Sequence, residues 1–482
     1  MRHTKIVATL GPAAEEKSEI KSLVEAGMDI ARLNFSHGTY DQFKKIVKNI
    51  RAVEKETGKT VVIMQDLQGP KIRLGQLPAK GIAVKRGEVV TFSIRGTEKG
   101  TIPLPYVALP HVVKKGDHLL IEDGLIRTKI LSISGRHVRA KVLTSGVLNS
   151  HKGVNIPDSR LPSSEALNEK DKKDLAFGVK MLGVDAVAVS FVENAADLER
   201  VRSAIARHTK RHIMLIAKVE RPKALLNINE IIQSADGIMV ARGDLGIEIE
   251  AERVPVEQKR ILALCRQEGK PVIVATQILQ SMVDSPLPTR AEMSDAATAI
   301  FDHADAFMLS NETAVGKYPS EAVRTLARVA QVTEEAIFKN AELFPAAPSI
   351  NPKQLEDETV ALNACKMADE IDAAAIVVLT RHGFTARTVL KHRPKNPVIV
   401  VTGSVELARQ LHFLWGVHHV YIHTGPFRSE EIVRELQKQK FLKKGQQIVS
   451  IKLSNEKRSL VLMTVGVNPK STVKLSEGRG ST

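Results

Sequence analysis

Cysteine and aromatic residues are scarce in this chain of 482 residues. Its two cysteines, Cys265 and Cys365, lie far apart in apolar segments, so we expect buried thiols rather than a disulfide, as in a cytoplasmic protein. Aromatic residues make up only 4% of the chain, too few to alternate with basic residues on a surface that stacks nucleic-acid bases. The composition therefore argues against a nucleic-acid partner.

Long apolar runs are also missing. No run reaches the roughly 18 apolar residues of a membrane span, and the apolar part of the N-terminal segment is too short for a secretory signal. What the chain does have is positive charge, with a formal net charge of +16 at pH 7. Because Lys and Arg are interleaved with Asp and Glu, we interpret this charge as a solvated surface that attracts small polyanions. The sequence predicts no membrane partner.

Eight strand-like apolar segments alternate with amphipathic helical stretches in the first two thirds of the chain. This alternation predicts an α/β fold in which a closed parallel sheet is surrounded by helices, the (β/α)8 TIM barrel. The expected strands are Thr4–Leu10, Met28–Phe35, Thr60–Leu67, Ala186–Val192, Ile213–Val219, Gly237–Val240, Pro271–Gln277 and Ala306–Ser310.

The segment between the third and fourth strands differs in texture. It has short alternating runs punctuated by Gly and Pro, which is typical of a small all-β domain, expected here as a small β-barrel. Its edges, Gln68–Pro70 and Gly153–Pro157, predict hinges, so the inserted domain can act as a lid.

A third domain is expected after the helical stretch Ser320–Lys339 and the Pro/Ala-rich segment Phe344–Pro352. Five candidate strands between 373 and 465 predict an α/β domain, and the last dozen residues read as a final strand or a frayed tail. The predicted division is a barrel of residues 1–69 and 156–345, an inserted lid of 70–155 and a C-terminal domain of 346–482.

Charged residues are concentrated where the expected barrel strands end. Lys218 and Glu220 close the fifth strand, and Gly243 and Asp244 follow the sixth. Two carboxylates on neighbouring strand ends can hold a hard divalent cation through oxygen, and a nearby lysine and glycine amides can hold an anion. This is the equipment of phosphoryl or enolate chemistry.

The amino-acid sequences of these segments and their order along the chain resemble the pyruvate kinase family over nearly the whole chain. The resemblance implies the same three domains and transfer of the phosphoryl group of phosphoenolpyruvate to ADP, which gives pyruvate and ATP in glycolysis. It also implies a cytoplasmic homotetramer that uses Mg²⁺ or Mn²⁺. The matching segments are TKIVATLGP, ARLNFSHG, QGPKIR, KGVNIP, FGVK with SFV, GIMVARGDLG, KPVIVATQ, PTRAEMSDAATA and TAVGKYPSEAV.

The resemblance assigns roles to the residues at the strand ends. Glu220 and Asp244 match the ligands of Mg²⁺, and Lys218 matches a lysine that neutralises the phosphoryl group and the enolate oxygen. Arg32 matches an arginine that clamps the phosphoryl group. The backbone amides of Gly243 and Asp244 are expected to receive the substrate carboxylate at a helix start.

Further positions match the enolate face and the nucleotide site. Thr276 matches a threonine on the methylene face of the enolate; because a hydroxyl is a weak acid, we expect a water relay through Ser310 rather than direct donation. Arg73 and Lys152 match residues that meet the ADP phosphates, and lid closure would deliver Lys152. The expected neighbours of these groups are Ser190, Phe191 and Gln277 as pocket walls, and Asn34 and His37 beside the nucleotide.

A departure from the family pattern concerns potassium. Most members bind K⁺ with residues that match Asn34, Ser36, Asp66 and the carbonyl of Leu67, and they carry an acidic residue where this chain has Lys71. Two cations side by side would repel by about 4 kcal/mol at about 4 Å and an effective dielectric constant near 20. Lys71 therefore predicts an enzyme that does not require K⁺; the alternative is that Lys71 points to solvent.

The third domain contains a loop that matches the family's site for a phosphorylated allosteric effector. The segment Thr380-Arg381-His-Gly383-Phe-Thr385 joins a strand to a helix, where hydroxyls and amides can form a phosphate-sized nest. Arg381, His382 and Phe384 replace some of the usual serines, and the 465–469 stretch lacks the Trp and Arg of fructose-bisphosphate-responsive members. A sugar monophosphate, a nucleotide, or a purely structural domain all stay open.

Two other functions are weighed against this reading. A magnesium-dependent aldolase or lyase on a related barrel would handle pyruvate enolate without ADP, but it would not need the lid with Arg73 and Lys152. A degenerate barrel that binds RNA would not need Lys218, Glu220 and Asp244 together. The sequence favours the phosphotransferase.

Overall fold

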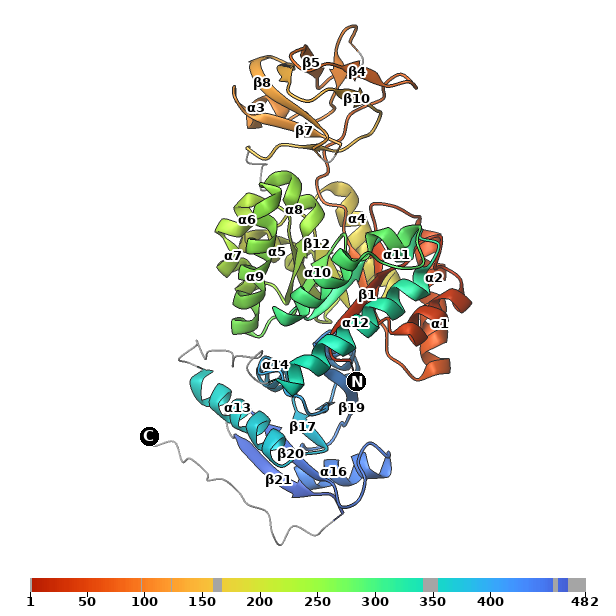
Figure 1. The fold of residues 1–482 in the computed structure, drawn as a ribbon, viewed down its shortest axis with the longest axis vertical. Helices are drawn as coiled ribbons and strands as arrows, with labels where there is room; N and C mark the ends of the chain where they lie inside the picture. The colour runs from red at the N-terminus through yellow and green to blue at the C-terminus, as the bar shows by residue number, and fades with distance from the viewer. Residues whose placement is uncertain are drawn as a thin grey trace.

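Three domains are stacked along the long axis of the molecule, as the computed structural model shows (Figure 1). The inserted lid lies at the top, the barrel in the middle and the C-terminal domain at the bottom. The structure describes residues 2–96, 98–122, 124–158, 167–340, 354–453 and 458–466. The Pro/Ala-rich boundary at 344–352 and the last dozen residues, about which the sequence made predictions, lie outside these described residues.

The central domain is a closed barrel of eight parallel strands, as predicted. Because all strands are parallel, their carboxyl ends meet at one end of the barrel. The seventh strand ends earlier than expected, at Ala275, because Thr276 and Gln277 both have positive φ (69° and 53°) and so leave the extended conformation. The strands are β1 Lys5–Thr9, β2 Ile30–Asn34, β3 Val62–Asp66, β12 Ala186–Val189, β13 Met214–Val219, β14 Gly237–Ala241, β15 Val272–Ala275 and β16 Ala306–Leu309.

Alternate residues of these strands fill the inside of the barrel, as a period of two residues requires. Small and large side chains such as Ala188, Met239 and Ile273 pack there. Phe413 from the C-terminal domain is fully buried in the same cluster and closes the barrel at its amino end. The open end of the barrel is therefore the other one, where the strands run out toward the lid.

The helices around the barrel bury their apolar faces on the outside of the sheet. Four of the described helices begin with capping boxes, for example Thr39 with Gln42 and Thr289 with Glu292, which satisfy backbone amides at the helix start. The helical segments are α1 Lys17–Ala26, α2 Tyr40–Thr57, α4 Glu169–Phe177, the π-helical Gly178–Leu182, α5 Ala195–Ala206, α6 Pro222–Leu226, α7 Ile228–Ser234, α8 Arg242–Glu248, α9 Val254–Glu268, α10 Arg290–Phe301, α11 Asn311–Ala314 and α12 Pro319–Lys339. Short 3-10 turns cover Ala251–Arg253 and Gln280–Val283.

The strands between β3 and β12 form the inserted domain. Within the described residues they make a six-stranded mixed sheet, in the order β11-β7-β8-β9-β5-β6, and a separate two-stranded sheet of β10 and β4. The expected small β-barrel is thus two sheets by backbone pairing, with one shared apolar core. The elements are β4 Ile82–Val84, β5 Val89–Ser93, β6 Ile102–Pro103, α3 Leu109–Val112, β7 His118–Ile121, β8 Ile126–Ser134, β9 His137–Val142, β10 Gly146–Leu148 and β11 Val154–Asn155.

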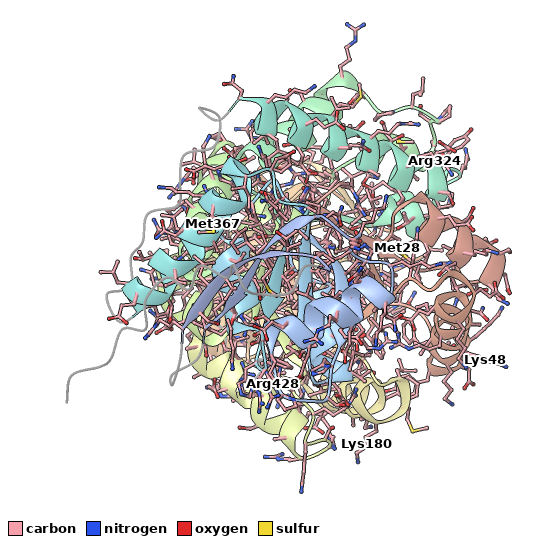
Figure 2. The ribbon with its side chains drawn as sticks, turned by 90° about the horizontal axis from the view of Figure 1, so that it is seen from below. Met28, Lys48, Lys180, Arg324, Met367 and Arg428 are labelled. Carbon is pink, nitrogen blue, oxygen red and sulfur yellow. The ribbon has the colours of Figure 1, made fainter. Side chains whose placement is uncertain are left out.

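The C-terminal domain is an α/β layer structure, as predicted. Its five-stranded sheet has the order β19-β18-β17-β20-β21, with β21 antiparallel to β20, and α13 and α16 pack on opposite faces. Seen from below, this domain lies across the middle of the barrel end, while Lys48 and Lys180 lie on the rim (Figure 2). The elements are α13 Leu355–Glu370, β17 Ala375–Leu379, α14 Phe384–Leu390, β18 Val398–Thr402, α15 Val405–Leu411, β19 Val417–Ile422, α16 Ser429–Lys438, β20 Gln447–Lys452 and β21 Ser459–Thr464.

Both cysteines are buried free thiols, and burial raises the pKa of each. Among the helices that the structure describes, none combines the length and the apolar content that crossing a bilayer would take.

Candidate active site

An open cavity of about 720 Å³ lies at the carboxyl end of the barrel and includes residues of α8. Figure 1 shows α8 on the side of the barrel that faces the lid. It is lined by Gly243 and Asp244 at the start of α8, by Thr276 and Gln277 after β15, and by Ser310 after β16. Lys71, from the first hinge of the lid, also reaches its wall. The polar residues that the sequence placed at three separate strand ends therefore share one cavity.

Lys218 lies at the centre of a buried charge cluster beside this cavity. Its ammonium is 2.8 Å from Glu220 Oε1, 3.2 Å from Asp66 Oδ1 and 2.8 Å from Ser190 Oγ. Burial acts to lower the pKa of Lys218, but the carboxylates of Asp66, Glu220 and Asp244 raise it above its usual value. The lysine therefore stays charged, and it can neutralise an anion at any physiological pH.

Asp66 joins two of the predicted catalytic cations. Its second carboxylate oxygen lies 2.7 Å from Nε of Arg32, whose Nη1 donates a hydrogen bond to Thr9 Oγ1 at 3.0 Å. Burial acts to raise the pKa of Asp66, yet the charges of Lys218 and Arg32 lower it. Sequence reasoning considered Asp66 only as a potassium ligand, and it did not consider Thr9. A signal for the link was present: Asp66 ends β3, and Arg32 lies two residues before the end of the neighbouring parallel strand β2.

Glu220 is buried with only 1% of its surface exposed, and its Oε2 accepts a hydrogen bond of 2.7 Å from the Phe191 amide. Burial first, and then the negative charge of Asp244, raise the pKa of Glu220 to about 7, against the effect of Lys218. The two carboxylates are thus close enough to repel each other. Such a pair fits a hard divalent cation, whose charge would favour the ionised form of Glu220.

No group of three or more His, Cys, Asp or Glu side chains is arranged as a metal site in the described part of the chain. A cation held by Glu220 and Asp244 would thus complete its coordination with other oxygens, such as those of a substrate or water.

The Thr276 backbone is strained where it meets α8. Thr276 and Gln277 are consecutive residues with positive φ, a conformation that costs a β-branched residue of the order of 1–3 kcal/mol. The Thr276 hydroxyl accepts a hydrogen bond of 2.8 Å from the Gly243 amide and donates one of 2.6 Å to the Ala275 carbonyl. The conformation directs Thr276 toward the α8 start, next to the expected carboxylate-binding amides.

Ser310 is held in place through its backbone. Its amide donates a hydrogen bond of 2.7 Å to Glu312, and the fully buried Glu312 also accepts one of 3.1 Å from the Leu279 amide. Glu312 thereby connects the strand ends of β15 and β16, a positioning role that sequence reasoning did not assign to it.

Ser190 and Phe191 form a crowded wall. The Ser190 hydroxyl donates a hydrogen bond of 2.8 Å to the Leu67 carbonyl, and Phe191 has φ of 56° with the Arg221 guanidinium 5.3 Å from its ring. Gly69 has φ of 71°, and a Cβ there would lie 2.7 Å from the Ser190 Cβ. Only glycine therefore fits at this point, where the chain leaves the barrel for the lid.

The predicted nucleotide-binding residues fall into two groups. His37 is exposed, and its pKa is lowered by partial burial and by the charges of Arg73, Lys71 and Arg32, so these cations lie around it. Asn34 is the last residue of β2, and its Oδ1 accepts a hydrogen bond of 3.1 Å from the Ser36 amide. Arg73 also donates one of 2.9 Å to the His151 carbonyl, just before the second hinge.

Lys152 belongs to the second group, on the lid. Its ammonium is 2.5 Å from Glu122, a lid residue with φ of 53° whose amide donates to the Gly153 carbonyl at 3.0 Å. The two hinge segments pair with each other, since the Leu74 amide donates to the Lys152 carbonyl at 2.9 Å. In this conformation the Lys152 ammonium is therefore paired within its own domain.

The expected potassium ligands already have protein partners. Asp66 contacts Arg32 and Lys218, the Leu67 carbonyl accepts from Ser190, and Asn34 accepts from Ser36. Lys71 is exposed, and it forms no ion pair with any residue in the described ranges.

In the predicted effector loop, the hydroxyls of Thr380 and Thr385 already have hydrogen-bond partners within the protein. Thr380 is buried, and its hydroxyl accepts a hydrogen bond of 2.9 Å from the Gly383 amide. The Thr385 hydroxyl donates to the Leu453 carbonyl at 3.3 Å, and Arg381 lies 5.5 Å from the Phe427 ring. Of these residues, Arg381 and His382 are exposed.

Comparisons with known proteins agree with this architecture. Residues 1–323 match the family model of the pyruvate kinase barrel domain, and residues 358–460 match that of the pyruvate kinase alpha/beta domain. A pyruvate kinase of Agrobacterium vitis is 45% identical over 420 residues, which are 86% of this chain and 87% of that one. A pyruvate kinase of Geobacillus stearothermophilus is 42% identical over 422 residues, 86% of this chain and 71% of the other.

A solved structure is similar over the whole molecule. The crystal structure of a pyruvate kinase from Cryptosporidium parvum has a TM-score of 0.86 and 33% sequence identity, and the match covers 96% of both chains.

Proposed function

This chain belongs to the pyruvate kinase family of phosphotransferases, and from that premise we propose that Lys218, Arg32 and Thr276 transfer the phosphoryl group of phosphoenolpyruvate to ADP. One observation carries the assignment to these residues. Asp66 holds both Lys218 and Arg32 by ion pairs, beside the cavity that Thr276 lines. Two fixed cations next to an open cavity form a preorganised site for an anion whose charge spreads during transfer.

The chemistry divides into two steps. In the first, a β-phosphate oxygen of ADP forms a bond to phosphorus while the bond from phosphorus to the enol oxygen breaks. Arg32 and Lys218 neutralise the phosphoryl oxygens, and Lys218 then stabilises the enolate oxygen that is left. In the second step, the enolate carbon takes a proton and pyruvate forms. Thr276 and Ser310 line the same cavity, which supports a water relay between them as the proton path.

Substrate orientation is assigned to the start of α8. The Asp244 amide lies at the positive end of the helix and can receive the substrate carboxylate, whereas the Gly243 amide donates to Thr276 Oγ1 and would have to exchange that partner for the substrate. Ser190, which donates to the Leu67 carbonyl and accepts from Lys218, positions the lysine rather than the substrate.

We assign a divalent cation, Mg²⁺ or Mn²⁺, to Glu220 and Asp244. When bound, the ion would add positive charge opposite the transferring group. The support is the repulsion between these two carboxylates, which contributes to the raised pKa of Glu220.

We further propose that catalysis does not require K⁺. The support is Lys71, whose positive charge lowers the pKa of His37, next in the chain to the matching position Ser36. The ion pairs of Asp66 with Arg32 and Lys218 add to it, since a bound K⁺ would have to share this carboxylate with two cations. A cytoplasmic homotetramer with a phosphorylated effector at the 380–385 loop is proposed from the family alone.

A coupled assay tests the catalytic assignment. Wild-type protein should form pyruvate only with phosphoenolpyruvate, ADP and a divalent ion present. Lys218→Met should lower kcat by a factor of about 10³ or more, because it removes a charge that acts mainly in the transition state.

The matched control is Lys223→Met. Lys223 lies five positions further along the chain and pairs with Glu193 at 2.7 Å, away from Asp66 and Glu220. Its kcat should stay within about twofold of wild type. Equal activity of Lys218→Met and Lys223→Met would remove Lys218 from the mechanism.

A further inference from the structure

The second hinge of the lid is tied to the barrel by a side-chain hydrogen bond. Asn155 Nδ2, at the end of β11, donates at 2.8 Å to Glu248 Oε1, at the end of α8. Glu248 is only 7% exposed. A hydrogen bond to a buried carboxylate is both strong and directional, so this contact holds the hinge against one point of the barrel.

The charges around Glu248 favour an uncharged donor as its partner. Burial raises the pKa of Glu248, and the carboxylates of Asp244 and Glu193 raise it further. The charge of Arg221 and the hydrogen bond from Asn155 act in the opposite direction. Asp244 precedes Glu248 by four residues, so the two carboxylates lie on the same face of α8. A carboxylate in place of the Asn155 amide would therefore be repelled.

A second segment of the lid lies against the same end of α8. Gly124, in the turn between β7 and β8, has φ of 83°, and a Cβ there would lie 3.7 Å from Ile247 Cγ2. The lid backbone therefore packs against the residue that precedes Glu248. The same turn contains Glu122, the ion-pair partner of Lys152. The lid thus meets α8 at two consecutive residues, and Lys152 is held close to this contact.

Backbone pairing joins Lys152 rigidly to Asn155. The Leu74 amide donates to the Lys152 carbonyl at 2.9 Å, and the Val154 amide donates to the Ile72 carbonyl at 2.9 Å. On its other side, β11 pairs with β7. Three residues of extended chain span about 10 Å, and the two ends of this segment cannot move independently while its pairing holds. A rotation of the lid about Asn155 would therefore carry Lys152 with it.

We propose that Asn155 and Glu248 form the pivot of the lid, and that this pair of positioning residues aligns the ADP phosphates with the substrate at α8. The inference rests on the proposed function, in which Lys152 meets the nucleotide and Asp244 lies at the substrate end of α8. One helix then sets the position of both substrates, phosphoenolpyruvate at its start and ADP through the hydrogen bond at its end. Phosphoryl transfer depends on this alignment, because a displacement of about 1 Å can cost about 10²-fold in rate.

The kinetic test exchanges the two functional groups of the pair in the full-length protein. Asn155→Asp sets two carboxylates against each other, so KM for ADP should rise about tenfold and kcat should fall about fivefold, with KM for phosphoenolpyruvate within about twofold of wild type. Glu248→Gln keeps an acceptor oxygen but loses its charge, so KM for ADP should rise only about two- to threefold. The double variant Asn155→Asp/Glu248→Gln restores one amide and one carboxylate with reversed roles. Its KM for ADP and kcat should return to within about threefold of wild type.

The matched control is Asn149→Asp, which introduces the same charge elsewhere in the lid, where Asn149 donates to the Val147 carbonyl at 3.3 Å. Its kinetic constants should stay within about twofold of wild type. No recovery in the double variant, or an equal rise of KM for ADP in Asn149→Asp, would overturn the pivot. A lower Tm of Asn155→Asp with unchanged KM for ADP would also overturn it, because the contact would then only stabilise the fold.

A distance measurement without substrate separates this inference from the proposed function. Spin labels at Arg136→Cys, in the lid turn between β8 and β9, and at Lys259→Cys, on α9, report the position of the lid, since both native cysteines are buried. The distance distribution should be about twofold broader with Asn155→Asp than without it, and narrow again in the double variant. Equal distributions in all three proteins would overturn the pivot. The expected distributions in a protein that forms no pyruvate from phosphoenolpyruvate and ADP would support the pivot and overturn the proposed function.

Discussion

The barrel end and the lid hinge both carry residues of the proposed active site, but they hold them in opposite ways. At the barrel end, Lys218 and Arg32 are buried on strands and fixed by ion pairs to Asp66. At the hinge, Arg73 and Lys152 come from loop segments, and Lys152 is exposed by 43% and bound to Glu122 of its own domain. Under the proposed roles, the phosphoryl-transfer charges are preorganised, whereas the nucleotide contacts are assembled by movement of the lid.

The largest effect on activity and stability is expected from Asp66→Asn, at the barrel end. The change leaves Lys218 and Arg32 as two buried cations without their shared partner. We expect kcat to fall by about 10²–10³ and the free energy of unfolding to fall by about 3–5 kcal/mol. The assay is pyruvate formation together with urea unfolding.

Glu56→Gln is the control for this prediction, because it removes a surface carboxylate that pairs with Lys17. Its unfolding midpoint should match wild type. If Asp66→Asn kept wild-type kcat, the barrel-end cluster would be a stability feature and not a catalytic one.

The next effect concerns the carboxylate that anchors the start of the hinge. Asp171 accepts a hydrogen bond of 3.2 Å from the Gly69 amide, and burial raises its pKa to about 6 from an ordinary value of 3.8. Since the folded state favours the protonated form, this group's stabilisation is full below about pH 4 and is lost as pH rises through about 6. The loss by neutral pH is about 3 kcal/mol.

Asp171→Asn should remove that pH dependence while keeping an oxygen for Gly69. Urea unfolding of wild type and variant between pH 4 and 7.5 measures the difference, which should favour the variant as pH rises. Asp41→Asn, at a carboxylate that is 91% exposed, should parallel wild type throughout. Parallel curves for Asp171→Asn as well would show that Asp171 is ionised in the folded protein.

A smaller effect, on KM for ADP, is expected from substitutions of Lys152 and Glu122 in the lid. Lys152→Met should raise KM for ADP about tenfold with little change in KM for phosphoenolpyruvate, because its charge is assigned to the nucleotide phosphates. Glu122→Gln should move KM for ADP in the opposite direction, by about two- to threefold, since Lys152 no longer has to leave an ion pair. Steady-state kinetics with each substrate varied separately decide this, and a loss of phosphoenolpyruvate affinity in either variant would place Lys152 elsewhere.

The smallest expected effect is that of potassium. Wild-type rates with NaCl and with KCl at equal ionic strength should agree within about a factor of two if the Lys71 charge makes K⁺ unnecessary. Lys71→Glu should lower the rate in NaCl, and KCl should restore it. Strong activation of wild type by KCl would overturn the proposal.

Much of the fold was predictable because it follows from local periodicity. The eight barrel strands, the α/β character of the C-terminal domain and the helix of 319–339 agree with the sequence within a few residues. The seventh strand was predicted too long, because the apolar periodicity does not indicate that Thr276 and Gln277 adopt positive φ. The candidate site was predictable at the level of which residues end the strands, since a parallel barrel brings all such ends together.

The partners within the site were less accessible to sequence reasoning. That Asp66 joins Arg32 to Lys218 depends on the register of β2 and β3 and on side-chain directions across the barrel. The ion pair of Glu122 with Lys152 depends on contacts within the lid between residues 30 positions apart. The packing of Phe413 in the barrel core depends on how two domains dock.

By itself, the sequence determined the architecture and the chemical type of the site, because periodic burial selects the barrel and its topology collects Lys218, Glu220, Asp244, Arg32 and Thr276 at one end. Only the tertiary structure decided how those charges are paired and where Lys152 rests. The physical reason is the separation of the interacting residues along the chain. The burial pattern of a strand or helix depends on residues close together in the chain, whereas the pairing of buried charges depends on distances of a few ångström between segments far apart in the chain.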